Sequence, residues 1–155
     1  NFTMKLDSNL MSKKIVAIGA DHAGFELKRS LLAALSDMGF CILDFGTNDA
    51  KSVDYPDIAD AVSDAITSGD AECGVLVCGS GIGMSIRANR HAGVRAALCH
   101  DEKTTRLARE HNDANILVLG ARVMADEVAI KCAQLFFATS FDGGERHVRR
   151  VAKLA

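Results

Sequence analysis

Short apolar segments alternate with amphipathic segments along most of the chain. The apolar segments predict buried strands, at 14–19, 41–45, 73–78, 94–99 and 116–119. Each of them is followed by a predicted helix, and in the helices after 14–19, 41–45 and 116–119 apolar residues recur every three or four positions, which is typical of one buried face. These predicted helices lie at 27–38, 56–66, 83–90, 103–110 and 125–138, with a last basic helix at 145–155. Because the strands are apolar throughout, they fit a parallel sheet covered on both faces. We therefore predict a single doubly wound α/β domain: a three-layer α/β/α, Rossmann-like arrangement of five parallel strands.

Composition limits the partners of this domain. Apolar residues make up 48% of the chain and charged residues 25%, and the net charge of -2 argues against nucleic acid or an anionic membrane surface as the main partner. No apolar run approaches the roughly 20 residues of a membrane-spanning helix. Residues 1–12 are mixed and polar, and we interpret them as a leader or a remnant of an added segment. The predicted domain covers 13–155.

Five cysteines are scattered through the apolar segments, at positions 41, 73, 78, 99 and 132. An odd number without paired spacing indicates reduced thiols and a cytoplasmic protein rather than a disulfide framework. We expect four of them, all but Cys78, to be small buried side chains. No second cysteine pair completes a zinc site, and no histidines have the helical spacing of metal ligands, so we predict no metal.

Polar, titratable side chains follow nearly every predicted strand. They are Asp21, His22, Asp44, Cys78, Ser80, His100, Asp101 and Arg122. In open α/β sheets, ligands bind outside the carboxyl ends of the strands. The sequence therefore predicts a site at that edge of the sheet.

Cys78 ends a predicted strand and is followed by glycines at 79, 81 and 83. The amides of such a turn can hold an anion, and a helix N-terminus beside a thiol lowers its pKa. The alternatives are a buried thiol that ends an apolar strand and a tight turn with no ligand. Residue types alone leave both interpretations open.

Two further groups have candidate chemistry. His22 stands beside Asp21, and His111 stands beside Asn112 and Asp113, so a neighbouring polar group could orient either imidazole for acid–base work. Arg146 and Arg150 lie four residues apart on the last predicted helix, so both guanidinium groups could reach one phosphate. The alternatives are solvated histidines and a solvated basic helix face.

Several blocks of the chain, in order from about residue 13 to the end, resemble ribose-5-phosphate isomerase B of the ribose/galactose isomerase family. The blocks are Gly-Ala-Asp-His-Ala-Gly-Phe-Glu-Leu-Lys at 19–28, Asp-Tyr-Pro at 54–56, Cys-Gly-Ser-Gly-Ile-Gly at 78–83, Ala-Asn-Arg at 88–90, Gly-Val-Arg-Ala at 93–96, Glu-His-Asn-Asp-Ala-Asn at 110–115, Gly-Ala-Arg-Val at 120–123, Gly-Glu-Arg-His at 144–147 and Arg-Val at 150–151. The resemblance implies an enzyme that interconverts ribose 5-phosphate and ribulose 5-phosphate without metal or cofactor. It also implies the sheet order 2-1-3-5-4 and a homodimer or homotetramer with active sites shared between subunits.

The resemblance implies roles for individual residues. Cys78 matches the proton-abstracting base, Ser80 an assisting hydroxyl that is commonly threonine, and His111 the acid that opens the sugar ring. Relatives without the cysteine use a glutamate where this chain has Met84, which cannot act as a base. The remaining matches are sugar contacts (Asp21, His22 and Asn112) and phosphate contacts (Arg122, Arg146 and Arg150). Apart from the resemblance, the amides of the turn formed by Gly79, Ser80, Gly81, Ile82 and Gly83 could hold a phosphate or an enediolate oxygen.

Three rival functions stay open. Similar chemistry on a six-carbon sugar phosphate, such as allose or galactose 6-phosphate, would use the same residues. A dinucleotide-binding module would place a glycine turn after the first strand and an acidic residue at Asp44, but Asp21 and His22 stand where a second glycine is needed. A non-catalytic phosphosugar sensor is the third.

Overall fold

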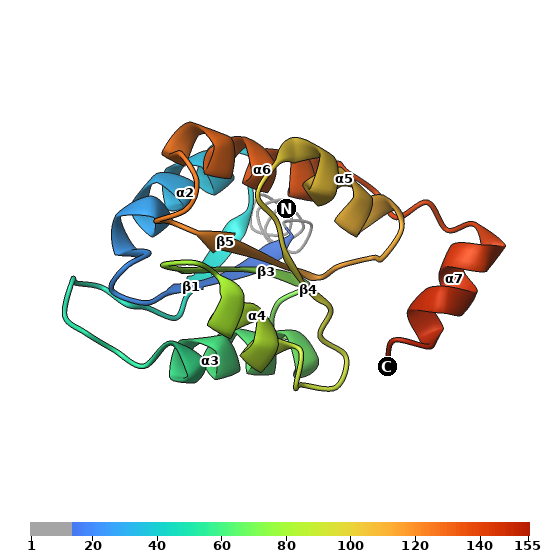
Figure 1. Ribbon diagram of the computed structural model, residues 1–155, viewed down its shortest axis with the longest axis horizontal. Coiled ribbons are helices and arrows are strands. Elements are labelled where there is room, and N and C mark those ends of the chain that lie inside the picture. Colours follow the sequence, from blue (N-terminus) through green and yellow to red (C-terminus); the bar gives the residue numbers. More distant parts are fainter. Residues whose placement is uncertain (1–13) are drawn as a thin grey trace, which may run out of the picture.

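The computed structural model describes residues 14–155, in which five strands and six helices follow one another along the chain (Figure 1). In order, they are β1 (Ile15–Ala20), α2 (Phe25–Asp37), β2 (Cys41–Asp44), α3 (Tyr55–Thr67), β3 (Cys73–Cys78), α4 (Ile82–Ala88), β4 (Ala96–Leu98), α5 (Glu102–Glu110), β5 (Ile116–Gly120), α6 (Asp126–Ala138) and α7 (Glu145–Ala152). The predicted elements are all present, with ends that shift by a few residues. Residues 1–12, interpreted above as a leader or remnant, lie outside the described residues.

The strands form one parallel sheet in the order β2-β1-β3-β5-β4, as the resemblance implies. Figure 1 shows α2, α5 and α6 on one face of the sheet and α3 and α4 on the other. The predicted three-layer α/β/α, Rossmann-like fold is therefore confirmed. In this topology each crossover helix begins near the carboxyl edge of the sheet and ends near the amino edge.

Successive residues of the central strands fill two separate cores. Ile18 and Val75 belong to the core under α2 and α6, while Ala17 and Leu76 belong to the core under α3 and α4. Side chains alternate across a strand, so a strand covered on both faces must be apolar at every position. This explains the continuous apolar runs of β1, β3 and β5.

Two elements at the margins of the fold, β2 and α7, are only partly covered. Cys41 is exposed, because β2 is an edge strand whose outer positions are not covered, so its predicted burial was wrong. The helix α7 stands away from the sheet (Figure 1), and His147 is its only buried residue.

No helix within residues 14–155 has the length and apolar character needed to cross a membrane.

Candidate active site

The carboxyl end of β3 leads directly into a tight turn around the Cys78 thiol. The side chain of Cys78 is buried, with 5% of the residue exposed, and the backbone N–H of Gly81 donates a hydrogen bond to Sγ over 3.1 Å. Gly81 has φ of +81°, which places it in the left-handed region that favours glycine. This conformation lets the chain reverse over the thiol and begin α4 at Ile82.

Burial raises the pKa of the Cys78 thiol above its ordinary value. The amides of Gly81, Met84 and Ser80 act in the opposite direction, and the Asp21 carboxylate adds to the rise. The prediction of a lowered pKa was therefore wrong: desolvation outweighs the backbone amides around the sulfur. A thiol in this position stays protonated over a wider pH range than an exposed one.

Asp21 and His22 leave the carboxyl end of the neighbouring strand β1, but the carboxylate does not orient the imidazole. Asp21 Oδ1 accepts hydrogen bonds from the amides of Ala23 at 3.0 Å and Gly24 at 3.1 Å, which stabilises its own turn. His22 Nδ1 instead accepts the backbone N–H of Val53 at 3.3 Å. In the neutral ring this contact leaves Nδ1 unprotonated, so Nε2 carries the proton.

Two more side chains, Arg122 and Tyr55, pack closely against glycines of the turn. A Cβ on Gly79 would lie 3.4 Å from Cδ of Arg122, and the Arg122 amide donates to the Gly79 carbonyl over 2.9 Å. A Cβ on Gly83 would overlap the Tyr55 ring, so only glycine allows the ring to rest there. Arg122 is thus placed at the turn as predicted.

The sequence interpretation assigned no role to Tyr55, although it follows the carboxyl end of β2 and belongs to the Asp-Tyr-Pro block. Its ring rests on Gly83, and the residue remains 39% exposed. Ser80, on the same turn, uses Oγ to accept the amide of Ile82 at 3.2 Å. Tyr55 therefore joins the residues that surround the turn.

The other predicted residues gather at the amino edge of the sheet. The ring of His111, which follows α5, stacks on the buried His147 of α7 with centroids 4.4 Å apart and planes 10° apart. The backbone joins the same two regions, because the Asp142 amide donates to the Glu110 carbonyl over 3.0 Å. Asn112 follows His111, and Arg146 and Arg150 are exposed on α7.

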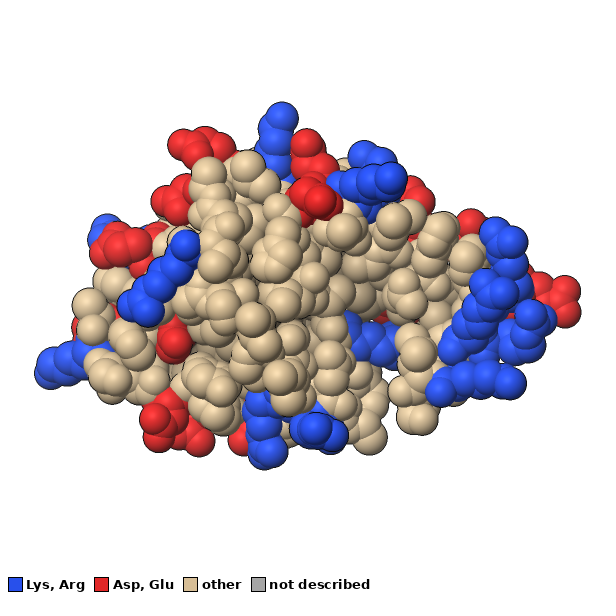
Figure 2. All heavy atoms as spheres, in the orientation of Figure 1, with Lys and Arg blue, Asp and Glu red and all other residues tan. Residues whose placement is uncertain are grey.

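The predicted site is therefore divided between two edges of the sheet. Figure 1 shows α7 beyond the amino ends of the strands, on the opposite side from the turn between β3 and α4. A five-residue strand alone spans about 16 Å. Figure 2 shows lysine and arginine side chains crowded over α7, where Arg146, Arg149, Arg150 and Lys153 are exposed. This helix presents its cations far from Cys78 of the same chain.

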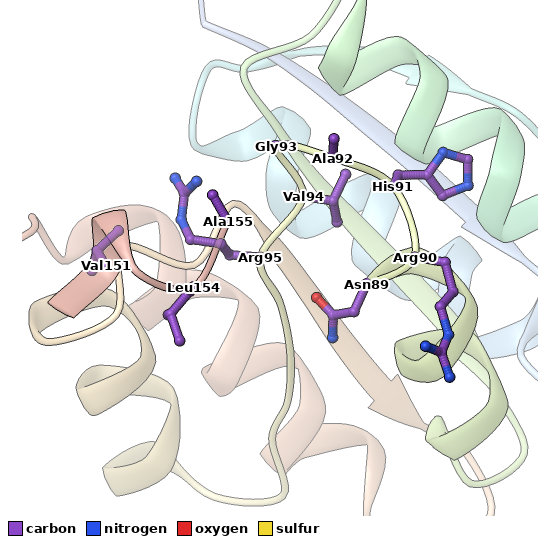
Figure 3. A pocket seen from close by; sticks show the side chains of 10 residues that line it. All are labelled: Asn89, Arg90, His91, Ala92, Gly93, Val94, Arg95, Val151, Leu154 and Ala155. Atoms are coloured by element: carbon purple, nitrogen blue, oxygen red, sulfur yellow. The ribbon is translucent and has the colours of Figure 1, made fainter.

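A cavity of about 260 Å³ also lies on the amino side, between the loop after α4 and the end of α7 (Figure 3). Its walls include Arg90, Arg95, Val94, Val151 and Leu154. Neither Cys78 nor any other residue of the β3–α4 turn lines it. A second hollow beside it, of about 380 Å³, reaches Asn112.

A profile of the ribose/galactose isomerase family matches residues 16–154 of the chain. The chain belongs to the ribose/galactose isomerase family. Ribose-5-phosphate isomerase B of Escherichia coli is 40% identical over 138 residues, which are 89% of this chain and 92% of that protein.

Solved structures agree with this membership. A ribose 5-phosphate isomerase from Thermotoga maritima has a TM-score of 0.87 and 49% identity, covering 91% of this chain and 97% of that chain. The type B ribose 5-phosphate isomerase of Trypanosoma brucei has a TM-score of 0.89 and 43% identity, covering 92% and 97%. The resemblance to ribose-5-phosphate isomerase B is thus confirmed over nearly the whole length.

No group of three or more metal-ligating side chains occurs among the residues described for this family member. Two of the polar residues predicted at strand ends, Asp44 and Asp101, make contacts that stabilise the fold. Asp44 binds the ammonium of Lys28 at 2.8 Å, and Asp101 caps α5 by accepting the Thr104 amide at 2.7 Å. These carboxylates are already engaged within the fold.

Proposed function

We propose that this chain interconverts D-ribose 5-phosphate and D-ribulose 5-phosphate, the aldose–ketose isomerisation of the non-oxidative pentose phosphate pathway. The observation that carries the proposal is the near full-length similarity to ribose-5-phosphate isomerase B proteins. The chain retains a thiol at the strand end where the cysteine-using members need a base. It is an aldose–ketose isomerase.

Cys78 is the proposed base. Its thiolate removes the proton from C2 of the open-chain aldose, and the electron pair forms the C1–C2 double bond of an enediolate. The same proton, or one exchanged with solvent, returns to C1 and gives the ketose, while the hydroxyl proton moves from O2 to O1. Because hydrogen and electrons balance within the sugar, the reaction needs no redox cofactor.

The turn after Cys78 is proposed to hold the developing negative charge. The candidate donors are the amides of Gly79, Ser80, Gly81, Ile82 and Gly83. Amides fixed in advance stabilise an oxyanion more effectively than water, which must reorient. The Gly81 amide already faces the sulfur, which supports a role for this turn close to the thiol. The Ser80 hydroxyl is the proposed assisting group.

The remaining residues would bind and open the sugar. We assign ring opening to His111, sugar contacts to Asp21, His22 and Asn112, and phosphate contacts to the arginines at 122, 146 and 150. Guanidinium groups bind phosphate oxygens with paired hydrogen bonds, so they can hold the substrate's far end. This binding orients the reacting carbons over the thiol.

These assignments require a second copy of the chain, as a homodimer or as part of a homotetramer. In one chain, His111 and α7 lie across the sheet from Cys78. Large apolar side chains stay exposed on both parts: Ile82 and Ile86 of α4 at 54% each, and Val148 at 49% and Leu154 at 60% near the C-terminus. Their burial between copies would be favourable at about 25 cal/mol per Å². We propose that α7 of one copy supplies the amino-edge residues to the turn of another.

The five cysteines are all unpaired in the structure, and they support a reducing compartment. We accordingly propose that the enzyme works in the cytoplasm.

A direct assay in D₂O tests the activity. Purified protein supplied with ribose 5-phosphate should form ribulose 5-phosphate, and deuterium should enter C1 of the product through the enediolate. Unphosphorylated ribose is the matched control and should react poorly because the arginines have nothing to bind. Absence of turnover with ribose 5-phosphate, together with turnover of allose or galactose 6-phosphate, would replace this substrate with a six-carbon one.

A further inference from the structure

One buried cation in α2 has no part in the proposed chemistry. Lys28 is only 1% exposed. Its ammonium lies 2.8 and 3.1 Å from the two carboxylate oxygens of Asp44 and 2.6 Å from the Thr47 carbonyl oxygen. Every hydrogen of the ammonium can therefore be used. The Asp44 side chain is 32% exposed, so the pair is buried mainly on the lysine side.

A buried ion pair of this kind is weak support for stability. Removing an ammonium from water is unfavourable, and apolar side chains of similar volume often stabilise a fold equally well. Such a pair can nevertheless fix geometry, because its hydrogen bonds are satisfied in one arrangement only.

Lys28 joins the two loops that leave β1 and β2. It lies in the first turns of α2, directly after the loop that carries Asp21 and His22. Asp44 ends β2, and the segment after it remains paired to the last residue of β1: Ala20 donates to Gly46 over 2.7 Å, and Thr47 donates to Ala20 over 2.6 Å. The ammonium thus links the start of the loop after β2 to α2, the helix that follows the loop after β1.

The loop after β2 also reaches the His22 imidazole, which lies in the short loop after β1. The loop after Thr47 runs through the exposed residues 48–52 and reaches Val53, whose amide donates to His22 Nδ1 over 3.3 Å. A hydrogen bond this long is sensitive to small shifts of the loop. The position of the Val53 amide depends on how the start of this loop is held, at Asp44 and Thr47.

We propose that Lys28 is a positioning residue for His22. By fixing the loop from Asp44 to Val53, it brings the Val53 amide to Nδ1 and keeps Nε2 as the protonated nitrogen of the neutral ring. His22 then offers a sugar phosphate a donor rather than an acceptor. The benefit to substrate binding rests on the proposed function, whereas the effect on the imidazole does not.

The test is a double variant, Lys28→Met with Asp44→Asn. It removes both charges together, so neither is left buried and unpaired, and the asparagine oxygen can still accept the Gly46 amide that Asp44 accepts at 2.9 Å. The matched control is Lys14→Met with Glu72→Gln, because that pair is exposed and 3.9 Å apart. Nitrogen-15 NMR of the ring nitrogens of His22 reports its tautomer, and kinetics with ribose 5-phosphate report its use.

In the wild type and the control, Nδ1 of His22 should give the signal of an unprotonated nitrogen and Nε2 that of a protonated one. In the double variant, the two signals should move toward the averaged values of an imidazole that exchanges tautomers. KM should rise roughly 10-fold with kcat within about twofold, a smaller loss than the 10²-fold that a 1 Å misplacement can cause. A loss of stability alone would leave the tautomer unchanged.

Wild-type ring signals and an unchanged KM in the folded double variant would overturn the proposal. If that variant does not fold, Asp44→Asn alone decides, because it keeps an acceptor for Lys28 but removes the charge. A smaller shift of the His22 signals in the same direction supports the proposal, and unchanged signals overturn it. If the wild type does not convert ribose 5-phosphate, the proposed function fails, and the ring signals still decide the role of Lys28.

Discussion

At the scale of single residues, the proposed base is a thiol that is buried in the structure. The sulfur of Cys78 is covered by the turn that follows it, and one amide of that turn donates to it. Desolvation and hydrogen bonding therefore act on the same atom in opposite directions. The structure shows desolvation as the larger of the two.

Replacing Cys78 by alanine should lower kcat by about 10²-fold to 10⁴-fold, because that is the usual contribution of a positioned base. Steady-state assays of ribose 5-phosphate isomerisation measure the loss. Cys41→Ala is the matched control, since Cys41 is an exposed thiol on an edge strand, and it should keep wild-type activity. Turnover of the Cys78 variant within tenfold of wild type would show that another group removes the proton.

The pH dependence of kcat/KM should carry the signature of the same thiol. The proposed active form is the thiolate, which exists above the thiol pKa, and burial raises that pKa. The value of kcat/KM should therefore still be rising with pH above neutrality, and this rise should occur at a higher pH than for an exposed cysteine. A profile measured from pH 6 to 10 tests this. A kcat/KM that already reaches its plateau below neutrality would contradict it.

At the scale of elements, the crossover helices determine which residues can meet. A helix such as α5 begins near the carboxyl edge and must end near the amino edge, because the next strand is parallel to the last. His111 follows the end of α5, so it lies where β5 begins and not where β3 ends. The position of His111 is therefore a consequence of the connection and not of its side chain.

The start of α5 provides a test at this scale. Asp101 caps the helix, and the hydrogen bond from the Thr104 amide is the main reason why the pKa of its carboxyl is lowered. A lowered pKa means that the cap stabilises the folded state above the carboxyl's unfolded pKa, and that this contribution is lost as the pH falls through its folded pKa. Asp101→Ala should lower the midpoint of urea unfolding at pH 7, with a smaller difference from wild type at pH 3.

Asp101→Asn is the control for this prediction, because it keeps the acceptor oxygen without the charge. Its midpoint should lie between those of the wild type and the alanine variant at pH 7. Equal midpoints for wild type and Asp101→Ala at pH 7 would show that the cap contributes nothing measurable.

At the scale of the whole molecule, the proposed shared site predicts complementation between inactive variants. Cys78→Ala lacks the proposed base at the carboxyl edge, and His111→Ala lacks the proposed acid at the amino edge. In a mixed dimer, one site contains both changes and the other contains neither. Random mixing should therefore restore about a quarter of the wild-type activity, since half of the dimers are mixed and each has one of two sites intact.

Co-refolding the two variants and assaying ribose 5-phosphate turnover gives the measurement. The matched control mixes Cys78→Ala with Ser80→Ala, which change the same edge and leave no mixed dimer with an intact site. Activity that stays at the level of the separate variants, in a sample shown to contain mixed dimers, would mean that each site belongs to one chain.

Much of the architecture could be predicted from local patterns. The apolar runs of β1, β3 and β5 identified the buried strands, since a strand covered on both faces has no polar position. Glycines 79, 81 and 83 marked the turn after Cys78, and the resemblance supplied the strand order. The association of Arg122 with that turn also followed, because both leave the carboxyl ends of neighbouring strands.

Only the tertiary structure decided what depends on distant neighbours. The raised pKa of Cys78 comes from desolvation, which is a property of everything packed around the sulfur. Cys41 is exposed because its strand lies at the edge, and Lys28 is buried because Asp44 and Thr47 meet it from another loop. The same reason separates Cys78 from His111: residue types and spacing identify the chemical groups, but the path of the chain decides which groups share one edge of the sheet.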